Sequence, residues 1–297
     1  MNVAEFGPAS GRKILLIHGS SAPSIVFSSL ARALAADGYR VLVFDLFGRG
    51  YSDAPIDVNY DERLFSTQIL YALYSSSLEW DRFSVVGYSL GGGIAVAFAA
   101  HFAHRIESLV LFAPAGLLEV SGLGYLTKLA RGGWVPKAIE TWMLGRLLVA
   151  RESAHQYDAP TEGGLDYSSV MKWQAAEHKG FINAFASSFR YGPIYDRQEE
   201  WRAVGKSAIE RMGVLIGERD DVVPPALLGE MVMLLGGQER VRGEILLHAG
   251  HNLVRERWRA CADFVGDVVG DPEGSDDGYD DDVMTASTST FEAAADF

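Results

Sequence analysis

A serine flanked by glycines, in the segment Gly87-Tyr88-Ser89-Leu90-Gly91, is the residue of this chain best placed to act as a nucleophile. The apolar residues 83–86 before it are typical of a buried strand, and the small residues 92–100 after it are typical of a buried helix. A Gly-x-Ser-x-Gly turn between a strand and a helix is a nucleophile elbow, which presents the serine hydroxyl at the start of the helix. The pattern alone also fits a glycine-rich turn that binds phosphate or only packs, so other residues must decide.

Two downstream loops hold the histidine and the carboxylates that a serine nucleophile needs. A serine hydroxyl is a poor nucleophile until a base takes its proton, and that base is usually a histidine held by a carboxylate. Asp220 and Asp221 follow the apolar run 211–217, and His248 and His251 follow the run 243–247. Sites in open α/β sheets form at the carboxyl ends of the strands, so we expect these side chains to meet Ser89 there. The residue types do not indicate which of the two aspartates would hold the histidine.

The elements that would position these residues alternate along the chain. Runs typical of buried strands lie at 13–17, 40–45, 83–86, 108–112, 211–217 and 243–247. Helical spacing is found at 24–37, 62–79, 225–235 and 253–269, as well as after Ser89. This alternation predicts an α/β fold in which helices cover both faces of a mostly parallel central sheet.

Two segments depart from that alternation. Residues 116–190 contain no buried-strand run but many leucines and aromatic residues among helix formers, and they predict a helical cap over the sheet. The core is then formed by residues 1–115 and 191–270. Residues 271–297 hold nine acidic residues and no Lys or Arg, a composition that predicts a disordered tail.

Composition excludes several classes of protein. The net charge of −13 comes mostly from the tail, so nothing suggests binding to nucleic acid. There is no apolar run of membrane-spanning length and no basic, apolar signal at the N-terminus, so we expect neither a membrane span nor a secretory signal. The single cysteine, Cys261, rules out internal disulfides and is expected to be buried. These features favour a cytoplasmic protein and leave its oligomeric state open.

Several motifs in order resemble the α/β-hydrolase fold family, in its capped form. They are His18-Gly19, Asp45-x-x-Gly48-Arg49-Gly50-x-Ser52, Gly87-Tyr88-Ser89-Leu90-Gly91-Gly92, Gly217-x-x-Asp220-x-Val222-Val223-Pro224 and Gly250-His251. The resemblance covers about residues 13–268 and is only architectural in the cap. It implies a hydrolase that uses Ser, Asp and His in this order along the chain, with no metal or organic cofactor.

The resemblance also implies a role for individual residues. Ser89 would be the nucleophile and His251 the base. The family pattern sets the acid three residues after Gly217, which selects Asp220. The oxyanion-hole N–H groups would come from Leu90 and from the residue after His18-Gly19, which is Ser20.

We expect structural or surface positions for the other residues of the motifs and for the remaining histidines. Asp45 and Arg49 would belong to a structural loop of the family. We expect His248 to be buried or hydrogen-bonded. The other histidines outside the motifs are expected at the surface; they are His101, His104, His155 and His178.

The sequence therefore predicts a serine hydrolase that cleaves a small apolar ester, or a related acyl bond, through an acyl-serine intermediate. Two alternatives stay open. One is a carbon–carbon bond hydrolase of the same fold, in which Arg190 and Trp173 of the cap would bind an anionic substrate. The other is a ligand receptor built on a hydrolase fold, which would show slow turnover and ligand-dependent partner binding.

Overall fold

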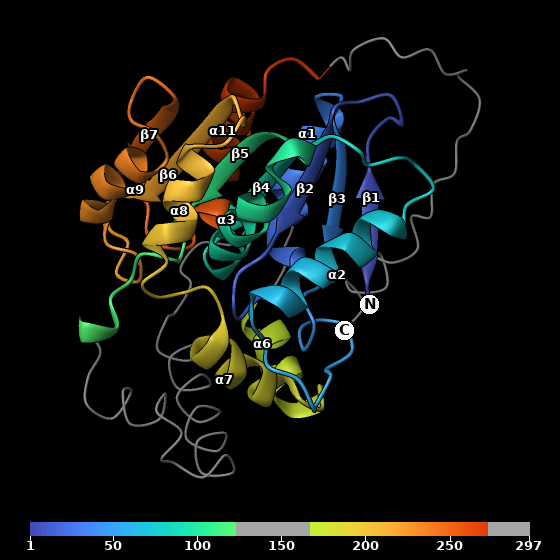
Figure 1. Ribbon diagram of the computed structural model, residues 1–297. Coiled ribbons are helices and arrows are strands. Elements are labelled where there is room, and N and C mark those ends of the chain that lie inside the picture. The colour runs from blue at the N-terminus through green and yellow to red at the C-terminus, as the bar shows by residue number, and fades with distance from the viewer. Residues whose placement is uncertain (123–166, 273–297) are drawn as a thin grey trace.

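The computed structural model describes residues 1–122 and 167–272 of the chain (Figure 1). Residues 123–166, which form much of the predicted cap, lie outside these described residues, as do residues 273–297 of the predicted tail. Among the described helices, none combines the length and the apolar character that a membrane span needs.

Seven strands of the described chain form one sheet in the order β1-β3-β2-β4-β5-β6-β7. They are β1 Val3–Phe6, β2 Lys13–Ile17, β3 Arg40–Phe44, β4 Phe83–Tyr88, β5 Ile106–Phe112, β6 Arg211–Gly217 and β7 Val241–Leu246. β1 runs antiparallel to β3, and the other neighbouring pairs are parallel. The strand with the serine, β4, lies at the centre, between β2 and β5. The α/β fold with a mostly parallel sheet is thus confirmed.

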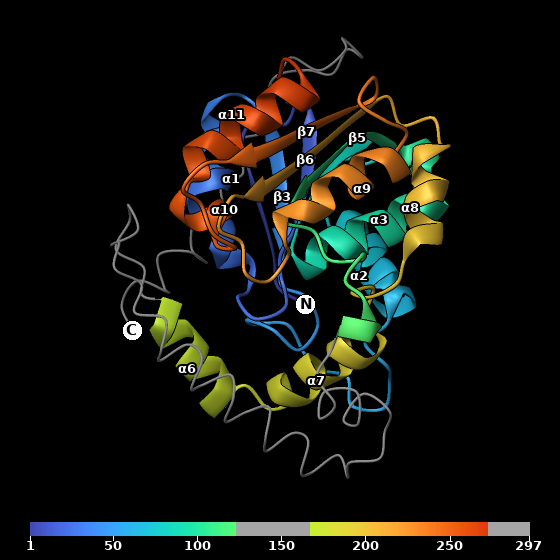
Figure 2. The same ribbon diagram turned by 90° about the vertical axis from the view of Figure 1, so that its left-hand side faces the viewer.

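Helices cover both faces of this sheet, as Figure 2 shows. One face carries α1 (Ser28–Ala36), α10 (Leu253–Glu256) and α11 (Trp258–Val269). The other carries α2 (Glu62–Tyr74), α3 (Leu90–Phe102), α8 (Gln198–Gly205) and α9 (Leu228–Leu234). Four short 3-10 helices of the described chain are η1 Ser24–Phe27, η2 Ala103–Arg105, η3 Val120–Gly122 and η4 Pro225–Leu227. Each face has its own apolar core, because successive strand residues point to opposite sides.

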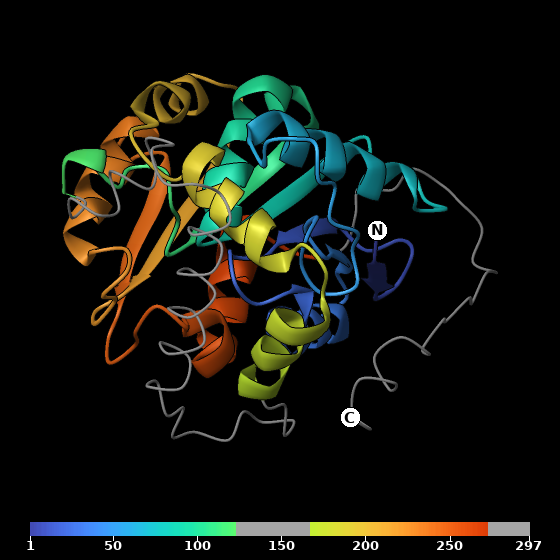
Figure 3. The ribbon, with the colours of Figure 1, turned by 90° about the horizontal axis from the view of Figure 1, so that it is seen from below.

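Two further helices lie beyond the carboxyl ends of the strands. They are α6 (Tyr167–Glu177) and α7 (Phe181–Tyr191). Figure 3 looks onto this edge of the molecule and shows both helices in front of the sheet. The chain breaks between these two helices at Gly180, whose φ of 101° a helix cannot continue.

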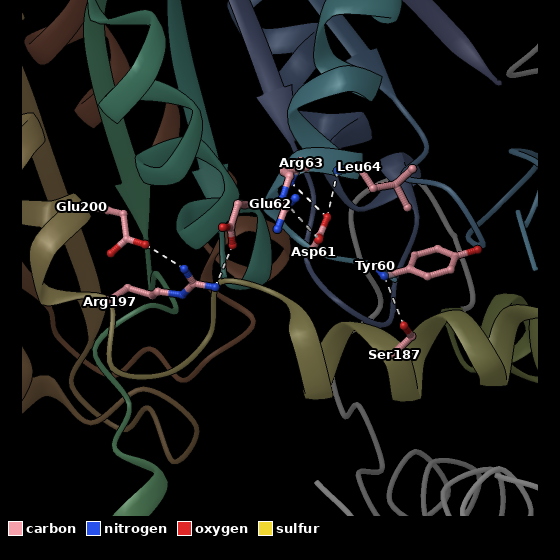
Figure 4. Close-up of polar contacts among 8 residues, drawn as sticks. All are labelled: Tyr60, Asp61, Glu62, Arg63, Leu64, Ser187, Arg197 and Glu200. Carbon is pink, nitrogen blue, oxygen red and sulfur yellow. Dashed lines mark hydrogen bonds and ion pairs between the residues drawn. The ribbon is translucent and has the colours of Figure 1, made fainter. Parts of the chain in front are cut away.

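The described chain leaves the sheet after β5 and returns to it before α8 at one place, beside Gly116. The Gly116 N–H donates to the Ile194 carbonyl at 2.9 Å, and the Arg197 N–H donates to the Gly116 carbonyl at 2.8 Å. The Arg197 side chain then bridges Glu62 on α2 and Glu200 on α8, each at 2.7 Å (Figure 4). Adjacent departure and return points are what an insertion into the core requires.

Candidate active site

Ser89 occupies a strained turn between β4 and α3. Its φ of 55° and ψ of −120° are unusual for a residue with a side chain. Its N–H donates to the Phe112 carbonyl at 3.0 Å, which fixes the turn to the neighbouring strand β5. The flanking glycines are required because a Cβ on Gly87 would lie 2.5 Å from the Gly91 carbonyl oxygen. The local sequence thus places the Ser89 hydroxyl at the carboxyl end of the central strand.

Three side chains from separate loops form a continuous hydrogen-bonded chain here. The His251 Nε2 lies 3.0 Å from the Ser89 Oγ. The other ring nitrogen, Nδ1, lies 2.9 Å and 3.1 Å from the two carboxylate oxygens of Asp220. Because a carboxylate only accepts, Nδ1 carries a proton, and in the neutral form of the ring Nε2 can then accept one from Ser89. The structure therefore brings together the serine, the histidine and one of the two candidate aspartates.

The two neighbouring aspartates have different surroundings. The Asp220 side chain is fully buried, and its Oδ1 also accepts the N–H groups of Val222 and Val223 at 2.9 Å and 2.8 Å. Asp221 is exposed to solvent. These hydrogen bonds hold the Asp220 carboxylate toward His251. The geometry therefore distinguishes the two aspartates, which residue type alone cannot do.

Tyr88 is a contact of this site that the sequence analysis does not identify. Its hydroxyl donates to the His251 carbonyl at 3.1 Å, and its ring lies 5.4 Å from the imidazole ring, measured between centroids. It ties the loop after β7 to the central strand. Its sequence signal is weak, because an aromatic residue beside a nucleophile also fits simple packing.

The two residues expected to supply an oxyanion hole lie on either side of Ser89. Leu90 is the first residue of α3, and N–H groups at a helix start have no partner within the helix. A Cβ added to Gly19 would lie 3.3 Å from the Ser89 Cβ, so the loop that contains Ser20 packs directly beside the serine. Two N–H groups in such positions suit an oxyanion, which develops on the oxygen of a carbonyl group whose carbon becomes bonded to the Ser89 Oγ.

His18 fixes one peptide of this loop. Its Nε2 accepts the Leu46 N–H at 2.8 Å, so its Nδ1 must carry the proton and donate to the Gly19 carbonyl, also at 2.8 Å. Burial lowers the pKa of His18 to about 4, which keeps the ring neutral. The Gly19 carbonyl shares its peptide with the Ser20 N–H, so holding one directs the other.

Asp45 and Arg49 hold the loop after β3. The Asp45 carboxylate accepts the N–H and the hydroxyl of Ser24 at 2.8 Å and 2.7 Å, and the Tyr51 N–H at 3.0 Å. Arg49 donates to two carbonyls, those of Ser20 at 3.1 Å and Phe47 at 3.0 Å. Burial lowers its pKa to about 10, which still leaves it charged at neutral pH. Both residues have the contacts of a structural loop.

The remaining histidines and the cysteine lie apart from this chain of contacts. His248 is exposed, and its Nδ1 lies 3.1 Å from an Arg219 nitrogen, so it is hydrogen-bonded without being buried. His178 is half-buried, with Nε2 donating to the Ser52 carbonyl at 2.9 Å, so the expectation of a surface position is wrong. Cys261 is buried, as expected.

Three other expectations concern histidines and cap residues. His101 and His104 are exposed, as expected, and His155 lies outside the described residues. Trp173 of α6 is 37% exposed and packs against Tyr51, with ring centroids 5.2 Å apart. Arg190 of α7 is half-buried, with its guanidinium over the Tyr191 ring.

Comparison with known proteins finds similarity in sequence and in fold. The sequence model of a family described as alpha/beta hydrolase fold matches residues 13–257. A serine hydrolase-like protein of Danio rerio is 30% identical over 128 residues, 43% of this chain and 38% of that protein. The 2-hydroxymuconate semialdehyde hydrolase of Pseudomonas sp. (strain CF600) is 26% identical over 270 residues, 87% of each chain. In fold, the chain is similar to an esterase from Exiguobacterium antarcticum, with a TM-score of 0.68 and 19% identity over 90% of this chain and 94% of that one.

Proposed function

The chain belongs to the α/β-hydrolase fold family, and we propose that it is a serine hydrolase that cleaves a carboxylic ester, or a related acyl bond, through an acyl-serine intermediate. The observation that carries this proposal is the hydrogen-bonded chain from the Ser89 Oγ through His251 to Asp220. A neutral imidazole with its acceptor nitrogen on a serine hydroxyl is arranged to remove the proton of that hydroxyl.

In the first half of the reaction, Ser89 attacks the carbonyl carbon of the ester. Its proton passes to the His251 Nε2, and Asp220 stabilises the imidazolium that forms. The carbonyl oxygen becomes negatively charged and accepts hydrogen bonds from the N–H groups of Leu90 and Ser20. Each such donor contributes on the order of 3 kcal/mol to transition-state stabilisation. When the carbon–oxygen bond breaks, the alcohol leaves with the proton from His251.

In the second half, water replaces the alcohol. The His251 Nε2, again unprotonated, takes a proton from a water molecule that attacks the acyl carbon. The same two N–H groups hold the oxyanion. The tetrahedral intermediate then releases the carboxylic acid, and His251 returns the proton to the Ser89 Oγ.

Covalent labelling tests this assignment. A fluorophosphonate is expected to add once, on Ser89, and Ser89→Ala is expected to abolish both labelling and esterase activity. Ser84→Ala is the matched control, because Ser84 lies buried on β4, the strand that precedes Ser89, and its hydroxyl has no hydrogen-bond partner within the described chain. Intact-mass analysis reads the adduct. An adduct on another serine, or unchanged activity in Ser89→Ala, would contradict the assignment.

We extend the proposal to the substrate, for which a small neutral ester is favoured. The support is the composition of residues 116–190, whose leucines and aromatic residues suit an apolar pocket between cap and core. A panel of p-nitrophenyl esters of increasing acyl length is expected to show its highest kcat/KM for neutral, medium-length chains. A preference of about tenfold or more for anionic substrates would oppose this.

A second candidate is hydrolysis of a carbon–carbon bond next to a carbonyl group. The observation that favours it is the match to a hydrolase named for 2-hydroxymuconate semialdehyde, a compound without an ester bond, over 87% of both chains. Turnover of a ring-cleavage dienoate, compared with the p-nitrophenyl esters, separates the two reactions. Activity confined to the dienoate would replace the ester proposal.

A further inference from the structure

Three successive carbonyl groups in the loop after β2 each accept a hydrogen bond from a different side chain. The Gly19 carbonyl accepts from His18 at 2.8 Å, as described above. The Ser20 carbonyl accepts from the Arg49 Nε at 3.1 Å, and the Ser21 carbonyl accepts from the Gln174 Nε2 at 3.0 Å. The three donor side chains, His18, Arg49 and Gln174, belong to residues with 0% exposure.

Gln174 is the donor that comes from the cap side of the molecule. It lies on α6, and its Oε1 accepts the Gly50 N–H at 2.8 Å while its Nε2 reaches the Ser21 carbonyl. An N–H can only donate and a carbonyl can only accept, so these two partners fix which way the amide points. One buried amide therefore joins the loop after β2 to the loop after β3.

Arg49 gives the same loop a second link to the cap helices. Its Nη2 donates to the hydroxyl of Ser188 on α7 at 2.9 Å, while its Nε holds Ser20. Ser188 in turn donates to the Ala184 carbonyl one turn earlier at 2.7 Å. Two of the three contacts on the loop are thus connected to α6 or α7.

These contacts restrict the direction in which the Ser20 N–H points. Each peptide is planar and trans, so a held carbonyl leaves its N–H no independent freedom. The Ser20 N–H lies in the first of the three held peptides, which are linked through the Ser20 and Ser21 Cα atoms, so a shift of the whole loop that redirects this N–H would also move the other two carbonyls away from their donors. Such a shift would leave buried polar groups without their hydrogen-bond partners, which is unfavourable.

We propose that Gln174 is a positioning residue, which holds the loop with the Ser20 N–H in the orientation needed to bind the oxyanion. The cap helix α6 then contributes to the rate of the chemical step as well as to substrate binding. This inference rests on the proposed serine hydrolase function and concerns the same site.

A residue that merely attached the cap would behave differently on mutation. Its loss would lower the melting temperature, or raise KM by loosening the pocket, and would leave kcat at saturating substrate unchanged. Loss of a positioning residue lowers kcat and weakens the binding of compounds that carry an oxyanion, because both depend on the same N–H group.

The test uses two substitutions of Gln174 and one control on the same helix. Gln174→Met keeps the length of the side chain and removes both hydrogen bonds. Gln174→Glu keeps the shape and the acceptor for Gly50, but its second carboxylate oxygen faces the Ser21 carbonyl and cannot donate when ionised. Tyr167→Phe is the control, because the Tyr167 hydroxyl joins α6 to the core at the Ile25 carbonyl, 3.1 Å away, outside the three held carbonyls.

The measurements are kcat and KM on one ester, and the inhibition constant of a trifluoromethyl ketone, which forms a charged adduct with the serine. Both Gln174 variants are expected to lose about tenfold or more in kcat, with KM within about threefold. Their inhibition constants should rise by the factor by which kcat/KM falls. Tyr167→Phe should change kcat by less than about threefold.

The outcomes separate this inference from the function on which it rests. If the wild-type enzyme forms neither an acyl-enzyme nor a ketone adduct at Ser89, the proposed function fails. If the wild type forms them and either folded Gln174 variant keeps its kcat and its affinity for the ketone, the positioning role is overturned. If Gln174→Met does not fold, Gln174→Glu supplies the measurement. A loss of kcat in Tyr167→Phe as large as that in the Gln174 variants would also overturn the positioning role.

Discussion

Asp220 and Asp221 are neighbours in sequence, and their different burial separates the effects expected of the same substitution. Asp220→Asn should lower kcat at least about a hundredfold, because the amide no longer favours the imidazole tautomer and charge that the reaction needs. Asp221→Asn should lower kcat less than about tenfold, because Asp221 is exposed to solvent and Asp220 already occupies the position beside the His251 Nδ1. Both variants are measured on one ester.

The ranking of the two variants decides the assignment. The reverse ranking would move the acid to Asp221. Two mild effects would place the acid elsewhere, and Glu218 of the same loop would be tested next. Equal melting temperatures of the two variants serve as the control for folding.

The buried neutral His18 predicts how stability depends on pH. Burial lowers its pKa in the folded protein to about 4, against an ordinary value of 6.5. Between these values the unfolded chain binds a proton that the folded chain does not, so stability falls as the pH falls from 6.5 to about 4. The full loss from this one group is about 3 kcal/mol. Urea unfolding at about pH 7, 5.5 and 4.5 measures it.

A variant without a titrating group isolates this contribution. His18→Gln is less stable at neutral pH, because the Gly19 and Leu46 contacts change, but its stability should fall less steeply over the same range. Parallel pH profiles for the wild type and His18→Gln would show that other groups cause the acid sensitivity.

Residue types and their order along the chain indicated Ser89 and the loop that contains His251, since few residue types perform nucleophilic and base chemistry, and the family resemblance favoured His251 over His248. The contribution of Gln174 was not predicted, although its position carries a signal. It follows Tyr167 and Met171 at the spacing of one helix face, and all three are buried. Trp173, which the sequence analysis named for a possible role in substrate binding, does not lie on that face. A polar residue on an apolar face reveals its partners only in three dimensions.

At the scale of elements, glycines in two helices allow a matched comparison. A Cβ on Gly91, near the start of α3, would overlap the carbonyl oxygen of Ile17. A Cβ on Gly229, near the start of α9, would meet nothing within 4 Å. We expect Gly91→Ala to lower stability by several kcal/mol and to reduce activity, on the scale of overpacking a tight core (about 1–3 kcal/mol or more).

Gly229→Ala should change the stability in the opposite direction and raise it. Alanine favours a helix over glycine by up to about 1 kcal/mol, and less near a helix end, so a small gain in stability is expected. Urea unfolding of both variants gives the two values. Similar losses in both would mean that general helix effects, and not the close approach of α3 to β2, determine the outcome at Gly91.

The strands were predicted more accurately than the helices, for a physical reason. Strands such as β2 and β4 are buried on both faces and therefore read as continuous apolar runs. The edge strand β1 has only four half-buried residues and was not assigned. Helix α8 was likewise not assigned. The helix expected over 253–269 is interrupted at Arg257, whose φ of −129° is not helical. The residue types at this position do not predict a break in the helix.

At the scale of the whole molecule, the C-terminal segment stays attached to the core as far as Pro272. The Arg12 N–H donates to the Pro272 carbonyl at 2.9 Å, and the Tyr39 hydroxyl donates to the Gly270 carbonyl at 2.6 Å. Removal of residues 273–297, which are acidic and contain few apolar residues, should leave activity and Tm nearly unchanged. Removal of residues 270–297 should lower Tm by several degrees, because both carbonyls are lost.

Thermal unfolding of the two truncated chains checks this difference. The longer deletion tests the contacts to Arg12 and Tyr39, and the shorter one is its control. A fall of several degrees in the shorter deletion would show that Phe291 or Phe297 contributes apolar contacts to the body.

The order of the strands has a consequence for how the protein is made. Ser89 and His251 are 162 positions apart, and β6 pairs with β5 only after the long segment between them has been synthesised. A nascent chain that has emerged as far as β5 can already pair β4 with both of its neighbours, yet it has no base and no acid. The proposed esterase would therefore stay inactive until β6, β7 and the loop that contains His251 have been synthesised and have joined the sheet.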